Sequence, residues 1–105
     1  MISIGLCMQF EFDWDPAKAE TNWRKHGVTF EQAMGIFSDP LALSLLDDES
    51  GAGEERWVTM GRNAAQELLL AVHTYTELAA DRAAIRIISV RRPARDPLLR
   101  EWMIR

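Results

Sequence analysis

The residues best suited to chemistry are arginines gathered near one end of the sequence. Residues 85–95 form an apolar, β-branched segment that carries Arg86, Arg91, Arg92 and Arg95. A guanidinium is planar, permanently charged and presents a fork of N–H donors that matches a phosphate group. The segment therefore indicates a site for phosphate groups, first of all those of nucleic acid. An acidic partner protein is the alternative ligand for the same arginines.

The net charge of −4 over 105 residues conceals an uneven distribution of charge along the chain. Residues 31–55 hold seven acidic residues and no lysine or arginine. Residues 85–105 hold six arginines and two acidic residues, which leaves a charge of +4. We expect one face of the protein to attract anions.

Length and composition favour an ordinary small folded domain. A chain of this length supports a single domain with one core, here residues 1–105, with residues 1–7 expected to be a disordered extension. Cys7 is the only cysteine, which excludes an internal disulfide and favours a cytoplasmic location. Cysteine and histidine pairs at metal-ligand spacing are absent, so neither a metal nor another cofactor is expected. No segment has the pattern of a signal peptide or the length of a membrane span.

The first half of the sequence predicts a strand and two helices. Residues 9–14 alternate polar with aromatic side chains, which is the period of a half-buried strand. Asp15 and Pro16 are typical of a helix start, and Gly27 is typical of the residue that ends one. A second helix begins with a capping box at Thr29 and ends before Pro40.

The second half predicts strands. Residues 41–46, 56–62, 68–75 and 85–90 have strand patterns, separated by a loop at 47–55, a turn at 63–66 and a loop at about 77–83. Asp96 and Pro97 repeat the signal for a helix start, so a C-terminal helix is expected. The fold class is therefore α+β, with an antiparallel sheet of about four to five strands, two N-terminal helices and a C-terminal helix.

Strand alternation predicts how the basic side chains divide between the two faces of the sheet. Arg86 and Arg92 are expected on one face, with Arg91 on the other near the end of its strand. Arg62 follows Gly61, where a backbone can approach a ligand closely. His73 lies in an apolar strand, so a core position is the structural alternative to a catalytic role.

Several sequence blocks resemble the BrnT family of toxins. The first runs from Phe12 to Glu31 and includes Asp15, Pro16, Asn22, Lys25 and Gly27. Further blocks include Asp39-Pro40, Gly53 to Arg56, Gly61-Arg62, Val72 to Thr74 and Ile85 to Arg92. The blocks follow one another in the family's order over most of the chain, so the likeness is more specific than a single motif.

The resemblance implies a ribonuclease toxin of a bacterial type II toxin–antitoxin pair with a RelE-like fold. It implies a BrnA-like antitoxin as partner, RNA as substrate and DNA contact only through the complex with the antitoxin. Whether the protein also forms a homodimer is left open. Carried over by matching motifs, the resemblance places catalytic residues at Arg62, His73, Arg86, Arg91 and Arg92, and RNA contact at Lys25.

Metal-free RNA cleavage requires cations around the phosphate, a general base for the 2′-hydroxyl and an acid for the departing oxygen. We expect the arginines named above to hold the phosphate, with Arg95 in contact with RNA. His73 or Glu101 is expected to be the base, and His26 or Lys25 the acid. The alternative is a catalytically weak or inactive interaction module, in which the arginines bind an acidic antitoxin that regulates its own operon.

Overall fold

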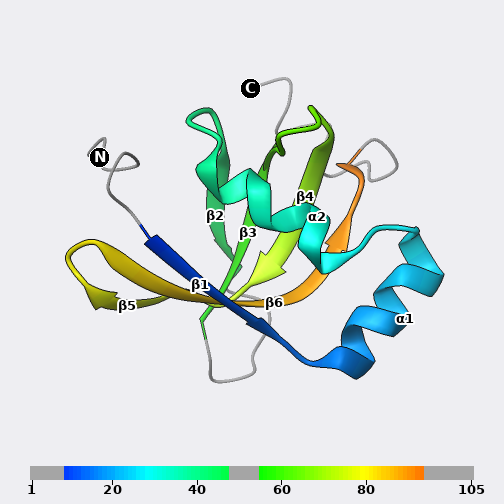
Figure 1. Ribbon diagram of the computed structural model, residues 1–105, viewed down its shortest axis with the longest axis horizontal. Helices are drawn as coiled ribbons and strands as arrows, with labels where there is room; N and C mark the ends of the chain where they lie inside the picture. The colour runs from blue at the N-terminus through cyan, green and yellow to red at the C-terminus, as the bar shows by residue number, and fades with distance from the viewer. Residues whose placement is uncertain (1–8, 48–54, 94–105) are drawn as a thin grey trace.

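The computed structural model describes residues 9–47 and 55–93. The described chain contains β1 (Gln9–Trp14), α1 (Pro16–His26), α2 (Phe30–Met34), the short 3₁₀ helix η2 (Gly35–Ser38), β2 (Leu43–Asp47), β3 (Arg56–Arg62), β4 (Leu68–His73), β5 (Thr76–Ala79) and β6 (Arg82–Arg91). Figure 1 shows α2 crossing one face of the sheet and α1 beside β6.

Both helices begin and end where the sequence predicts. The Asp15 side chain accepts a hydrogen bond from the Ala17 N–H, Pro16 occupies the first turn, and Gly27 adopts the left-handed conformation with φ of 66°. Thr29 and Gln32 form the reciprocal hydrogen bonds of a capping box at the start of α2. The second helix changes to the tighter η2 at Gly35, and it ends before Pro40 as expected.

The sheet is mixed and has six strands, with the order β1-β6-β4-β3-β2 and with β5 paired to part of β6. The sequence pattern predicted an antiparallel sheet of about four to five strands, and this prediction was wrong in two respects. First, β1 runs parallel to β6. The helices carry the chain from β1 at one edge of the sheet to β2 at the opposite edge, and the chain then comes back strand by strand until β6 lies beside β1 in the same direction. Second, the predicted loop at 77–83 contains β5, which forms a hairpin with the start of β6.

The main core lies between the sheet and α2. Phe30, Ala33 and Ile36 pack against strand residues of β4 and β6 that include Leu69 and Ile85. A smaller apolar cluster around Met60 and Leu70 lies on the other face of the sheet. The predicted C-terminal helix and the predicted extension at residues 1–7 lie outside the described residues.

Candidate functional site

A β-bulge in β6 decides which face of the sheet each arginine occupies. Val72 pairs with Ser89 while the next residue, His73, pairs with Ile87, so Ile88 is the extra residue. The bulge shifts the alternation of side chains by one position. Val90 therefore joins Ile87 in the core beneath α2, and Arg91 is turned to the opposite face. We call this opposite face the distal face.

The distal face is defined by rows of side chains that the strand register places side by side. Its members are Leu43, Leu45 and Asp47 on β2, Arg56, Val58, Met60 and Arg62 on β3, Leu68, Leu70 and Val72 on β4, Arg86, Ser89 and Arg91 on β6, and Asp13 on β1. Directly paired residues share a face of a sheet, and so do residues two apart on one strand. The Met60–Leu70 cluster, which is separate from the main core, confirms the assignment.

Arg62 and Arg91 lie at one end of the distal face, on the two strands that flank β4. Arg62 pairs with Leu68, and Arg91 pairs with Leu70, two residues further along the same strand. Residues two apart on a strand are separated by about 7 Å and strands on either side of a third by about 10 Å, so the two Cα atoms are about 12 Å apart. The register therefore places two arginines from distant parts of the sequence on one surface, close enough for their long side chains to contact the same phosphate.

Arg86 and Arg56 lie at the other end of the distal face. Trp57 pairs with His73, so Arg56 is opposite Thr74, and the Thr74 N–H donates to the Arg86 carbonyl at 3.0 Å. Arg86 forms an ion pair with Asp13, its partner in the parallel ladder.

Arg56 is a further candidate and was not among the site residues predicted from the sequence. Its Nε is buried and has no hydrogen-bond partner within the described residues. A buried donor without an acceptor is costly in a folded protein, and such donors commonly face a ligand or an ordered water. The available sequence signal was alternation, because Arg56 and Arg62 are six residues apart on one strand and therefore share a face.

Arg92 lies on the helix-covered side, opposite to the prediction that grouped it with Arg86. Its guanidinium is 3.6 Å from the Glu67 carboxylate and 3.5 Å from the His26 carbonyl oxygen. The prediction was wrong because a regular alternation takes no account of the bulge at Ile88. Hydrogen bonds from Asn63 and Gln32, together with the Arg92 charge, hold the pKa of Glu67 below its usual value.

His73 is buried beneath the helix-covered face, with 3% of its surface exposed. Nε2 is 2.7 Å from the Thr59 hydroxyl, Nδ1 is 2.9 Å from the Thr74 carbonyl oxygen, and the ring meets Phe37 edge-on. Burial lowers the pKa of His73, and the hydrogen bond to Thr74 offsets this only in part. The placement favours the structural interpretation of this histidine.

Of the remaining predicted residues, the structure describes Lys25 and His26. Lys25 and His26 lie at the C-terminal end of α1, and both line a cavity between that helix and β6. Glu101 and Arg95 lie outside the described residues.

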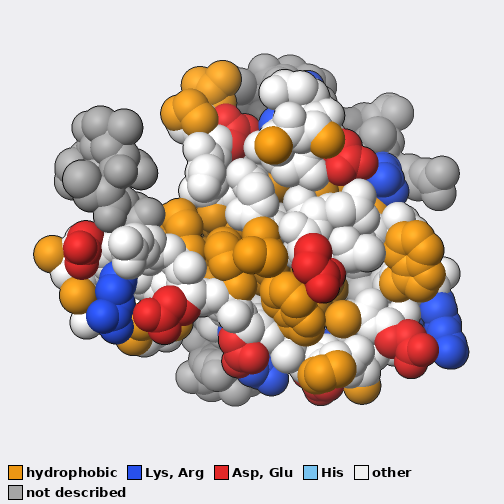
Figure 2. Space-filling model, in the orientation of Figure 1, with side chains coloured by type: hydrophobic (Ala, Val, Ile, Leu, Met, Phe, Trp, Pro, Cys, Tyr) orange, Lys and Arg blue, Asp and Glu red, His pale blue; other side chains and the backbone are white. Residues whose placement is uncertain are grey.

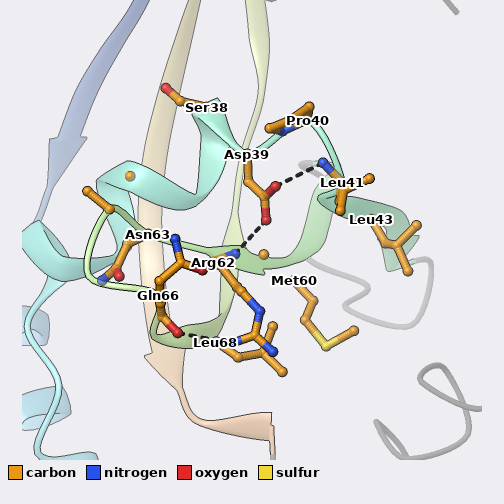
Figure 3. Close-up of a pocket in the computed structure, with 13 residues that line it drawn as sticks. Ser38, Asp39, Pro40, Leu41, Leu43, Met60, Arg62, Asn63, Gln66 and Leu68 are labelled. Atoms are coloured by element: carbon orange, nitrogen blue, oxygen red, sulfur yellow. Dashed lines mark hydrogen bonds between the residues drawn. The ribbon is translucent and has the colours of Figure 1, made fainter.

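Arg62 also borders a cavity of about 610 Å³ (Figure 3). Its guanidinium donates to the Gln66 carbonyl at 2.9 Å, and Gln66 itself adopts a positive φ of 66° in the turn. The Asp39 carboxylate accepts the backbone N–H groups of Arg62 at 2.7 Å and Leu41 at 2.9 Å. These two hydrogen bonds lower the pKa of Asp39. Asp39 thereby fixes the end of β3 from which Arg62 projects.

The helix-covered side has a different charge pattern. In Figure 2 the lysine and arginine side chains of that side lie apart, with acidic side chains between them. Within residues 9–47 and 55–93, no three histidine, cysteine, aspartate or glutamate side chains are grouped to hold a metal ion. No helix of the described chain is long and apolar enough to cross a membrane.

Comparison with known proteins identifies the family. Residues 14–96 match the family described as ribonuclease toxin, BrnT, of type II toxin–antitoxin systems. The chain belongs to the BrnT family. The match covers the strands that carry the distal-face arginines and confirms the family resemblance found in the sequence.

A solved BrnT structure has the same fold. The chain is similar to the Brucella abortus ribonuclease toxin BrnT, whose crystal structure was determined at 1.1 Å, with a TM-score of 0.51 and 19% sequence identity. The alignment covers 79% of this chain and 95% of the Brucella protein. At this identity the likeness concerns the fold. No match was found among curated protein sequences.

Proposed function

We propose that this BrnT-family chain cleaves RNA on its distal face without a metal ion and is neutralised by a BrnA-like antitoxin. The observation that carries the proposal is that Arg62 and Arg91 lie at one end of a single face of the sheet, with Arg56 and Arg86 further along the same face. A transferring phosphate needs cations fixed in advance around it, and arginines held on the strands of one sheet meet that need. The cytoplasm, where RNA is abundant, is the proposed location.

In this mechanism Arg62 and Arg91 bind the scissile phosphate from the two sides of β4. Fork-like donation to non-bridging oxygens stabilises the charge that develops on the phosphate as the 2′-oxygen attacks. Arg86 and Arg56 bind a neighbouring part of the backbone, because both lie on the distal face.

Glu101 is the proposed general base, because His73 is enclosed on the opposite face with both ring nitrogens hydrogen-bonded. The departing 5′-oxygen takes its proton from water, because His26 and Lys25, the predicted acids, line the separate cavity beside α1. Lys25, Arg92 and Arg95 are proposed to contact RNA outside the reacting linkage. DNA is bound only through the antitoxin, and self-association as a homodimer is left to experiment.

The test is inducible expression in bacteria, followed by analysis of total RNA and by cleavage assays of the purified protein in EDTA. We expect growth arrest and RNA fragmentation, reversed by co-expression of the antitoxin, and cleavage that persists in the chelator. The Arg62→Ala/Arg91→Ala double variant should fold normally and lose cleavage. Full cleavage by that variant, or loss of wild-type cleavage in EDTA, contradicts the mechanism.

The second candidate is an interaction module without enzymatic activity. The observation that favours it is that Arg86 and Arg92 already engage carboxylates, those of Asp13 and Glu67. Carboxylates of an acidic antitoxin would bind arginines by the same geometry. A purified protein that binds antitoxin tightly but leaves RNA intact, and whose expression leaves growth unchanged, would support this candidate.

A further inference from the structure

A cavity of about 370 Å³ lies between α1 and the bulged part of β6. Its lining includes Lys18, Lys25, His26 and Ser89, and none of its described lining residues is acidic. Cavities of a few hundred Å³ accommodate small ligands or single groups of larger ones. The combination of volume and positive charge indicates an anionic ligand.

Asn22 fixes the shape of this cavity. Its side chain is 5% exposed, accepts the Val90 N–H at 3.0 Å and donates to the carbonyl oxygens of Val90 at 2.9 Å and Val28 at 3.1 Å. β1 ends its pairing with β6 at Ile87, so Asn22 supplies the hydrogen bonds that a neighbouring strand would otherwise make. The helix is thereby held against the bulge, and the cavity exists before any ligand binds.

Lys18, Lys25 and the Ser89 hydroxyl line the cavity and are available to bind an anion, because no described residue pairs with them. Lys18 and Lys25 are seven residues apart, two turns of α1, and so project from one side of the helix. Neither forms an ion pair within the described chain, whereas Arg24, next to Lys25, is paired with Glu20 at 3.3 Å. The Ser89 hydroxyl makes no hydrogen bond to the described residues.

The cavity adjoins the distal face through Ser89. Ser89 lies on β6 two residues before Arg91 and on the same face, because both follow the bulge. A strand bound at Arg91 therefore reaches the cavity within about 7 Å along β6.

We propose that this cavity binds a phosphate, with its attached ribose, of an RNA strand whose scissile linkage lies at Arg62 and Arg91. The inference rests on the proposed ribonuclease function and adds a second contact site to it. Lys18 and Lys25 bind the phosphate as mobile point charges, and Ser89 bonds to the sugar–phosphate backbone. RNA is favoured over an acidic peptide because Ser89 of the cavity and Arg91 of the proposed cleavage site lie two residues apart on β6, so a single nucleic-acid strand with regularly spaced phosphates can contact both.

The test uses fluorescence anisotropy with oligodeoxythymidylates of two and eight residues, which lack the attacking 2′-hydroxyl and stay intact. Lys18→Ala/Lys25→Ala should weaken binding of the octamer by about tenfold or more and leave the dimer unaffected. The slope of log K against log salt should fall by about 0.7, since the cavity holds one phosphate and each phosphate contact on a single strand contributes about 0.7. Lys18→Arg/Lys25→Arg should retain the octamer affinity.

Arg24→Ala is the matched control, because it removes the same charge as Lys25→Ala from the next residue of the helix, outside the cavity. Unchanged octamer binding by the lysine double variant, or equal loss from Arg24→Ala and Lys25→Ala, overturns the proposal. So does a lysine variant that binds the octamer normally but loses the antitoxin. Failure of the ribonuclease proposal has a different signature, because the wild-type protein then leaves RNA intact.

Discussion

The Thr59 hydroxyl oxygen lies 2.7 Å from Nε2 of His73 in the interior of the protein. The Thr74 carbonyl can only accept, so Nδ1 carries the proton and Nε2 accepts from Thr59. Thr59 in turn is 2.7 Å from the Ser44 hydroxyl, which donates to it. This chain of hydrogen bonds joins β2, β3 and β4 and defines a neutral imidazole.

Protonation of His73 should therefore destabilise the fold. Its pKa is lowered by burial, so below the unfolded value of about 6.5 the unfolded chain takes up a proton that the native protein resists. Stability is complete above that pH and is lost as pH falls from about 6.5 towards the lowered native pKa. We expect the urea midpoint to fall between pH 8 and pH 5.5, and to fall less in His73→Gln. Equal pH dependence in both proteins would contradict the assignment.

Arg91 and Arg92 provide a direct comparison of the two faces of the sheet. Arg91→Ala removes a guanidinium from the distal face and should lower the rate of RNA cleavage by at least about a hundredfold. Arg92→Ala removes the same charge from the helix-covered side, beside Glu67, and should have a much smaller effect on cleavage. Single-turnover cleavage of a defined RNA measures both. The reverse order of effects would exclude the distal face as the reaction surface.

The guanidinium of Arg56 should matter more for activity than for stability. Arg56→Lys keeps the positive charge but removes the planar fork of donors and the unpaired Nε, so cleavage should fall by about tenfold while the thermal midpoint changes little. Arg82→Lys, a matched change at an exposed arginine paired with Glu11, should leave cleavage unchanged. A loss of stability without a loss of activity would assign Arg56 a structural role.

Asp39 should act on Arg62 through the backbone. Asp39→Ala leaves the N–H groups of Arg62 and Leu41 without their acceptor and should cost about 1 kcal/mol of stability, since water reaches this site. Because its pKa is lowered, its contribution is present above pH 4 and is lost as pH falls through the native value. Asp39→Asn retains a single acceptor oxygen and should be milder, as measured by urea unfolding at pH 7.

Asn22 should be among the costliest polar residues to remove. Asn22→Ala leaves the buried N–H and C=O of Val90 unsatisfied and should lower the free energy of unfolding by about 2–4 kcal/mol. Asn22→Asp keeps the acceptor for the Val90 N–H but sets a carboxylate against two carbonyl oxygens, so it should also destabilise. Urea unfolding monitored by tryptophan fluorescence checks both. Near-wild-type stability of Asn22→Ala would show that water replaces the amide.

The sequence by itself determined the local elements and the family. Asp15, Gly27 and Thr29 predict the helix boundaries because caps depend on the nearest backbone groups. The strand patterns of β3, β4 and most of β6 were visible in their apolar and β-branched residues. The ordered blocks from Phe12 to Arg92 were sufficient to indicate the BrnT family, which the family match confirmed.

Only the tertiary structure decided which arginines share a surface. Strand partners are chosen by contacts between distant segments, such as the pairing of Asp13 with Arg86, and local periodicity carries no information about them. One extra residue at Ile88 placed Arg91 on the distal face and Arg92 on the other. The face on which a strand residue lies depends on how many residues separate it from the preceding β-bulge. Packing between strands fixes where that bulge falls.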